Sequence, residues 1–72
     1  MLTYDRRALK RLMAERGLDP EQVSRLAGIA RPTVSYLSRG VTEPKASTMA
    51  KLATALQVEV GVFFQRRARR VA

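Results

Sequence analysis

The stretch that decides the fold is Asp19-Pro20-Glu21-Gln22-Val23-Ser24-Arg25-Leu26-Ala27, then Gly28-Ile29-Ala30, then Arg31-Pro32-Thr33-Val34-Ser35-Tyr36-Leu37-Ser38-Arg39-Gly40. This pattern predicts two short helices around a tight turn. Asp19 is a good N-cap, Pro20 fits a first helical position that can spare its N–H, and Gln22 occupies the reciprocal position of a capping box. Gly28 and Gly40 follow the two helices, where glycine adopts a left-handed conformation without strain.

Each of these helices carries one apolar stripe at helical spacing. Val34 and Leu37 form the stripe of the second helix, and the stripe of the first consists of Val23, Leu26 and Ala27. Helices this short are not stable alone in water, so other segments must pack against both stripes. The positions that the second stripe turns away from the core are Arg31, Pro32, Thr33, Ser35 and Tyr36. All but the proline carry hydrogen-bonding groups, which gives a surface able to read another molecule.

Apolar periodicity on either side predicts three more helices. Their expected bounds are Thr3 or Asp5 to about Arg16, Ala46 or Ser47 to Leu56, and from Glu59 or Val60 onward. The sequence therefore predicts an all-α, compact five-helix domain over residues 1–65 and a basic tail over residues 66–72. The core that we expect consists of Leu9, Leu12, Leu18, Val23, Leu26, Ala27, Ile29, Val34, Leu37, Met49, Leu52, Leu56, Val58 and Phe63.

The composition argues against several classes of function. The 72 residues contain no histidine and no cysteine, so disulfides, the usual nucleophile–base pairs and most metal ligand sets are absent. We therefore expect neither an enzyme nor a cofactor. No apolar run approaches the roughly 20 residues that span a bilayer, and the N-terminus lacks a signal-peptide pattern. A soluble cytoplasmic protein without membrane contact is the expectation.

The charge indicates a polyanionic partner. Fourteen Lys and Arg against six Asp and Glu give a net charge of +8 and a sequence pI of about 11.4. Four of these arginines lie in the tail, and residues 1–65 hold ten basic and six acidic residues, a net +4. The tail is open to three interpretations: a solubilising end, additional nonspecific phosphate contacts, or an RNA-binding segment.

The order of a helix, the turn Gly28-Ile29-Ala30, a second helix and the end Arg39-Gly40 resembles the helix-turn-helix of the phage repressor and Cro (XRE-type) family. The resemblance covers roughly residues 8 to 64. It implies a lambda-repressor-like DNA-binding domain with a helix-turn-helix at about residues 20–39, in which the helix 31–38 enters the major groove of double-stranded DNA.

The resemblance also implies roles for single residues. Base contacts are expected from Arg31, Pro32, Thr33, Ser35 and Tyr36. Phosphate contacts are expected from the backbone N–H of Glu21 and from Gln22, Arg39 and Lys45. Three alternatives stay open: Arg31 as a phosphate ligand or solvated cap, Tyr36 as a packing residue, and Gln22 held by the capping box.

Several positions depart from the family pattern. Pro20 stands where many relatives have a phosphate-clamping glutamine, and Ala30 stands where a Ser or Thr usually caps the recognition helix. Met13 and Ser38 occupy the positions of a buried Arg–Glu ion pair found in many relatives. Both partners are replaced together, and no buried charge is left unpaired as a result.

The functional expectation is a repressor-like transcriptional regulator that occupies a short operator as a homodimer, with half-sites about 34 to 36 Å apart. The expected dimer contact is the last helix, through Val60, Val62, Phe63 and Phe64. The alternatives are an antitoxin that binds both operator and toxin, and a protein–protein adaptor that has kept the fold without DNA binding. A small-molecule effector is not expected in a single small domain.

Overall fold

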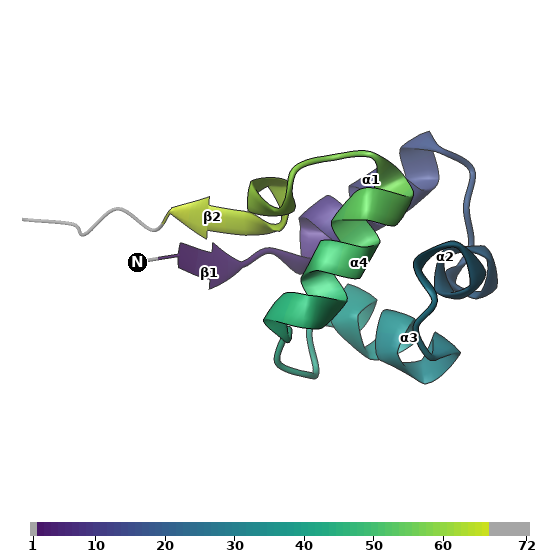
Figure 1. Cartoon of the computed structure of the whole chain (residues 1–72). Coiled ribbons are helices and arrows are strands. Elements are labelled where there is room, and N and C mark those ends of the chain that lie inside the picture. Colours follow the sequence, from purple (N-terminus) through teal and green to yellow (C-terminus); the bar gives the residue numbers. More distant parts are fainter. Residues whose placement is uncertain (1, 67–72) are drawn as a thin grey trace, which may run out of the picture.

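The computed structural model describes residues 2–66, and residues 67–72 of the expected basic tail lie outside the described part. The elements in chain order are β1 (Leu2–Tyr4), α1 (Arg6–Glu15), α2 (Pro20–Ala27), α3 (Arg31–Arg39), α4 (Ala46–Leu56), the 3₁₀ helix η1 (Val60–Phe63) and β2 (Phe64–Arg66). Figure 1 shows the four α-helices gathered at one end of the molecule and the two strands side by side at the other.

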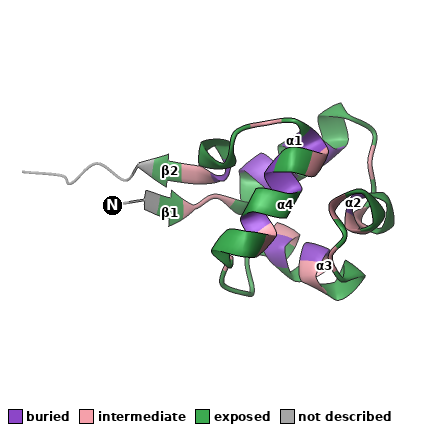
Figure 2. Ribbon diagram, in the orientation of Figure 1, coloured by how far each residue is buried: buried purple, intermediate pink, exposed green. Residues whose placement is uncertain are grey.

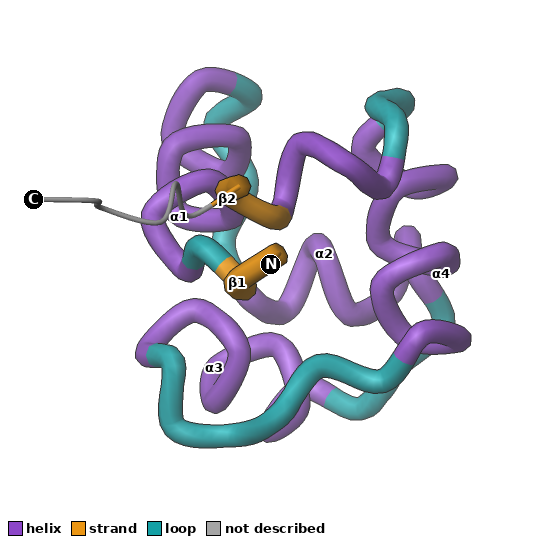
Figure 3. Tube along the Cα trace, turned by 90° about the vertical axis from the view of Figure 1, so that its left-hand side faces the viewer, coloured by secondary structure: helices purple, strands orange, loops and turns teal. Residues whose placement is uncertain are grey.

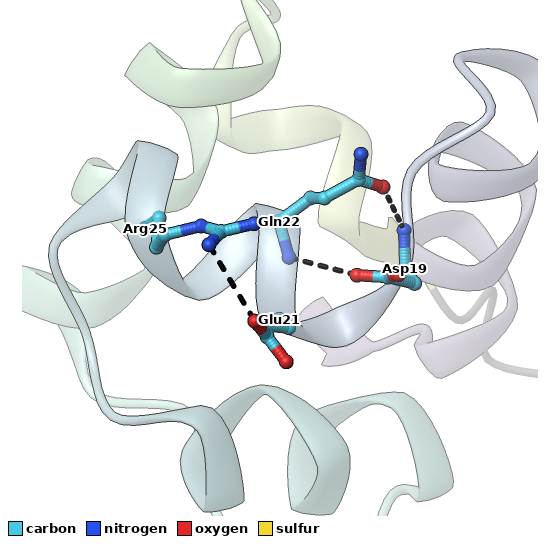
Figure 4. A network of polar contacts seen from close by, with 4 residues as sticks. All are labelled: Asp19, Glu21, Gln22 and Arg25. Carbon is cyan, nitrogen blue, oxygen red and sulfur yellow. Dashed lines mark hydrogen bonds and ion pairs between the residues drawn. The ribbon is translucent and has the colours of Figure 1, made fainter.

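Local chemistry sets the ends of the first two helices. Asp5 caps α1 by accepting a hydrogen bond from the backbone N–H of Arg7 at 3.0 Å. In α2 the expected capping box is present, because Asp19 and Gln22 each accept the other's backbone N–H, at 2.8 and 2.9 Å (Figure 4). Gly28 ends α2 in the left-handed conformation, with φ of 69°.

The next two helices lack a side-chain cap at their start. Ala30 precedes α3 and Lys45 precedes α4, and neither side chain accepts a hydrogen bond from the first turn. Gly40 ends α3 with φ of 72°, and Gln57 ends α4 in the same left-handed region with φ of 58°. The described bounds of α1 to α4 agree with the expected ones to within about one residue, apart from the alternative start of α1 at Thr3.

The expected fifth α-helix is wrong. Residues 60–63 form one turn of 3₁₀ helix, and the following three residues are the strand β2, which pairs antiparallel with β1. The register places Leu2, Thr3 and Tyr4 opposite Arg66, Gln65 and Phe64. The β-branched valines near Gly61 disfavour a helix, and strand pairing gives the backbone its hydrogen bonds instead. Asp5 N–H extends the contact by donating to Phe63 O at 2.7 Å.

The core lies between α1, α3 and α4, where Figure 2 shows the buried segments facing one another. Its buried members are Ala8, Leu9, Leu12, Met13, Val23, Val34, Leu37, Met49, Leu52, Ala53, Leu56 and Phe63. Four other expected members are half-buried at its edge: Leu18, Ala27, Ile29 and Val58. The prediction of Leu26 as a core residue is wrong, because 58% of it is exposed. Leu26 lies three residues after the buried Val23, which places it about 60° around the axis of α2 from the side that faces the core.

None of the helices in residues 2–66 has both the length and the apolarity that a membrane crossing requires.

Candidate nucleic-acid interface

One side of α3 packs in the core, and the opposite side is exposed. Val34 and Leu37 are essentially fully buried, with exposed fractions of 0% and 1%. Arg31, Pro32 and Tyr36 are exposed, Tyr36 to 45%, because the helical period turns them to the opposite side. Three of the five side chains that the sequence assigned to base contact, Arg31, Pro32 and Tyr36, thus lie on the exposed face of a helix that the core holds in place.

One open hollow, of about 300 Å³, gathers most of these residues against the start of α2. It is lined by Pro20, Arg31, Pro32, Ser35, Tyr36 and Arg39. Arg31 and Arg39 lie eight residues apart on α3, which is about 12 Å along a helix. The lining of the hollow therefore combines two guanidinium groups with two proline rings and an aromatic ring. Guanidinium groups donate to guanine edges and phosphate oxygens, and the ring surfaces suit apolar contact with a thymine methyl.

Tyr36 and Arg39 are paired within this hollow. The guanidinium carbon of Arg39 lies 5.5 Å from the centroid of the Tyr36 ring, the geometry of a cation–π contact. Tyr36 is not a core residue, because 45% of it is exposed, although it lines the hollow with Pro20 at the start of α2. Its ring instead forms a platform on the surface, held from one side by the Arg39 side chain.

Thr33 lies apart from the other expected base contacts. It is half-buried and lines a second hollow with residues of α3, α4 and the loop between them: Leu37, Thr42, Glu43, Lys45 and Thr48. Lys45 brings a positive charge to this hollow, and Glu43 brings a negative one. The fold therefore separates the predicted site into a larger group beside α2 and a smaller group beside the α3–α4 loop.

The start of α2 offers backbone donors. The N–H of Glu21 lies in the first helical turn and has no intrahelical acceptor, whereas Asp19 takes the N–H of Gln22 (Figure 4). The side-chain oxygen of Gln22 is also engaged, by the N–H of Asp19, and its amide nitrogen is left as the donor. Gln22 lines a hollow with Leu18, Arg25 and Leu26, on a side of α2 different from that of Pro20.

Two residues that sequence reasoning did not assign to the site hold the far end of α3. The hydroxyl of Tyr4 donates to Leu37 O at 2.8 Å, and Arg6 Nη1 donates to Arg39 O at 3.1 Å. Burial, together with a smaller effect of the nearby Asp5 carboxylate, raises the pKa of Tyr4 to about 12, so the phenol keeps its proton and remains a hydrogen-bond donor at neutral pH. Both bonds join positions 33 residues apart, and no local sequence signal reveals such a pairing.

The replaced ion-pair positions carry no charge. Met13 is buried in the core, and the hydroxyl of Ser38 donates to Ser35 O at 2.9 Å within α3. Among the residues that the structure describes, no polar or charged residue is classed as buried. The interior near α3 is therefore apolar, and of the two polar contacts between the N-terminal segment and α3, that of Arg6 is exposed and that of Tyr4 is partly buried.

The four residues expected at the dimer interface differ in how far they are buried. Val60 and Val62 are exposed to 44% and 41%, and Phe64 is half-buried. Phe63 is fully buried in the core, so its side chain is not available to a second chain. The exposed valines occupy a 3₁₀ helix instead of the expected α-helix.

An exposed helix held by two apolar anchors, packed on a second helix across a glycine turn, defines a helix-turn-helix protein of the DNA-binding class. The family model described as "Helix-turn-helix" (HTH_3) matches residues 9–63. The chain belongs to this family of DNA-binding transcriptional regulators, the XRE or Cro/C1 type. A comparison with curated protein sequences gives no match.

Two solved structures are similar to this fold. The restriction-modification controller protein C.AhdI from Aeromonas hydrophila has 32% sequence identity and a TM-score of 0.78, over 82% of this chain and 89% of the other. An HTH_3 family transcriptional regulator from Vibrio cholerae has 28% identity and a TM-score of 0.76. That match covers 81% of this chain but 33% of the Vibrio protein, so this chain corresponds to about a third of it.

Proposed function

We propose that this protein is a sequence-specific, repressor-like regulator that inserts α3 into the major groove of an operator and acts as a homodimer. The observation that carries the proposal is the pairing of burial and exposure on α3. Val34 and Leu37 are buried, and Arg31 and Tyr36 project from the opposite side. The helix-turn-helix family and the two regulator structures give the general class, and the outer face of α3 gives the reading surface.

The roles follow from side-chain chemistry. Arg31 has the planar fork that pairs with guanine O6 and N7, and Ser35 hydrogen-bonds either kind of base edge. Pro32 and the Tyr36 ring offer apolar surface to a thymine methyl. Thr33 lies beside the α3–α4 loop and is assigned a contact at the edge of the groove.

Phosphate contacts are assigned to both flanks of α3. On one flank, the N–H of Glu21 points from the positive end of α2, with the amide of Gln22 as a second donor. On the other flank, Arg39 and Lys45 supply cations. Gln22 is the weakest member of this set, because it lines a hollow on a different side of α2 from the α3 residues.

The homodimer is assigned to the region of η1. Val60 and Val62 are apolar, exposed and two residues apart, with the half-buried Phe64 beside them. A single recognition helix covers few base pairs, and two copies related by a two-fold axis read twice as many. We expect Val60→Asp to shift the protein from dimer to monomer in sedimentation equilibrium. A wild-type protein that stays monomeric at high micromolar concentration, with and without operator, would rule out this assignment.

Selection of bound duplexes from a random pool at near-physiological salt tests the DNA-reading function. We expect enrichment of a two-fold symmetric site whose half-sites lie about 10 to 10.5 base pairs apart, or a multiple of this. Arg31→Ala should lower the preference for one base pair by about 5- to 150-fold, the equivalent of roughly 1–3 kcal/mol. Its melting temperature should stay close to that of the wild type, because Arg31 is exposed.

Lys10→Ala is the matched control, because Lys10 is equally exposed but lies on α1. It removes one positive charge and should weaken binding to all sequences alike. If no sequence is enriched and Arg31→Ala behaves like Lys10→Ala, α3 does not read bases. The protein–protein adaptor that has kept the fold without DNA binding then becomes the better interpretation.

A further inference from the structure

The C-terminal end of α3 is held from outside the helix-turn-helix. The last carbonyls of a helix have no intrahelical donor and carry the negative end of the helix dipole. Here Leu37 O accepts the Tyr4 hydroxyl at 2.8 Å, in addition to the Gly40 N–H at 3.2 Å, and Arg39 O accepts Arg6 Nη1 at 3.1 Å. A neutral donor and a cation thus contact two carbonyls of the last turn, two residues apart. Figure 3 views the molecule from the side on which β1 and β2 pair, and β1 leads directly through Asp5 into Arg6.

The aliphatic part of Arg6 also packs against the residue that ends α3. A Cβ added to Gly40 would lie 2.8 Å from Arg6 Cδ, closer than real Cβ contacts come. Gly40 therefore serves two purposes: it adopts φ of 72°, and it leaves room for Arg6 to reach Arg39 O. A glycine after a helix predicts the positive φ from sequence, but it does not predict the space for Arg6.

Tyr4 is itself fixed by the second strand. It pairs with Phe64 in the register of the sheet, and the two rings make an edge-to-face contact with centroids 6.0 Å apart. Its neighbour Asp5 donates its N–H to Phe63 O and accepts from the Gln65 side chain at 2.9 Å. The sheet, the start of α1 and the end of α3 are therefore joined in one chain of contacts.

We infer that Tyr4 and Arg6 are positioning residues for DNA recognition, which hold the last turn of α3 in the orientation that docks in the groove. The inference rests on the proposed function of α3. The last turn carries Arg39, which supports the Tyr36 ring, and it leads into the loop that ends at Lys45. A small displacement of this turn would therefore move Arg39, Tyr36 and Lys45, which are all assigned to DNA contacts.

The experiment compares Tyr4→Phe and Arg6→Met with the wild type on the selected duplex. Tyr4→Phe removes only the hydroxyl and keeps the ring contact, and Arg6→Met keeps the aliphatic chain and removes the donor. Arg7→Met is the matched control for charge, because Arg7 is exposed in the same first turn of α1. We expect Kd to rise about 3- to 10-fold for Tyr4→Phe, and by a similar factor for Arg6→Met beyond the Arg7→Met effect. Arg6→Lys should restore part of the loss.

Two further readouts separate positioning from other roles. The slope of log Kd against log salt concentration should be equal for Arg6→Met and Arg7→Met. If the slope is lower by about one in Arg6→Met alone, Arg6 is a phosphate ligand and the inference is overturned. Amide exchange at residues 38–41 of the free protein should be faster in Tyr4→Phe and Arg6→Met than in Arg7→Met. Unchanged exchange, or a lowered melting temperature with wild-type Kd, would also overturn it.

The exchange measurement uses no DNA, so it remains informative if the proposed function fails. A wild-type protein without sequence preference would remove the DNA-reading function. Faster exchange in the two variants would still support the hold on α3, and unchanged exchange would reject it.

Discussion

The helix-turn-helix segment, residues 19–40, and the terminal segment formed by β1, η1 and β2 are built in opposite ways. In the first, the deciding bonds join residues that are close in sequence, such as Asp19 and Gln22 three positions apart. In the second, they join the two ends of the described chain, such as Gln65 and Asp5, which are 60 positions apart. Local contacts therefore define the bounds of α2 and α3, whereas long-range contacts close the core and hold α3 at its C-terminal end.

The terminal segment is not an accessory to the core. Phe63 is the largest of its fully buried side chains, and it precedes β2 directly. The helix-turn-helix contributes three buried residues, Val23, Val34 and Leu37, and each has a smaller side chain than Phe63. We therefore expect the most damaging single truncation to lie in the terminal segment.

Phe63→Ala is the change with the largest expected effect. Truncating a fully buried phenylalanine removes its transfer free energy and leaves a cavity, which together cost about 3–5 kcal/mol. Native domains have free energies of unfolding of roughly 5–15 kcal/mol and a domain this small lies toward the low end, so the variant should keep little of its stability at ambient temperature. Urea denaturation followed by circular dichroism measures the loss.

Leu26→Ala is the matched change in the helix-turn-helix. Leu26 is 58% exposed, so its truncation should cost less than about 1 kcal/mol. Similar losses of unfolding free energy in Phe63→Ala and Leu26→Ala would contradict the contrast between the two segments. That result would mean that Leu26 is covered in solution, or that the terminal segment does not pack as described.

The sequence predicted the helices well because their ends depend on neighbouring residues. Asp19 and Gln22 form their capping box, and Gly28 and Gly40 end their helices in the left-handed conformation. The same local reasoning failed for residues 60–66, because apolar residues at helical spacing also suit a short turn followed by a strand. Only the pairing with β1, far away in sequence, decides between the two.

The candidate site was predictable to the same extent. Periodicity placed Val34 and Leu37 inside and turned Arg31 and Tyr36 outward, and the structure agrees. Periodicity could not show that Thr33 belongs to a separate hollow, because that depends on where the α3–α4 loop runs. It also gave no sign of Tyr4 or of the role of Arg6, since both act across the fold. Leu26 was misassigned because α2 faces the core over a narrower stripe than its apolar residues suggest.

Gly40→Ala and Gly28→Ala test the place where the two regions meet. Both glycines have positive φ, so alanine costs about 1–2 kcal/mol at either position. Gly28 has open space for a Cβ, whereas a Cβ at Gly40 would force Arg6 to move. Gly40→Ala should therefore be the more destabilising of the two in thermal unfolding. It should also weaken DNA binding more, and equal losses in both variants would show that Arg6 does not pack tightly on Gly40.

Ala30→Ser is the smallest change and should increase stability. Ala30 has the extended conformation of an N-cap, with φ of −66° and ψ of 140°, but no side-chain oxygen to accept an N–H from the first turn of α3. A serine there supplies that acceptor, worth about 0.5–1 kcal/mol, and should raise the melting temperature by roughly 2–8 °C. The matched control is Ala14→Ser, an exposed position inside α1, where serine lowers helix propensity and should be slightly destabilising. Opposite signs for the same substitution would establish that α3 begins at an uncapped end. A loss of stability in both variants would mean that the first N–H groups of α3 are already satisfied.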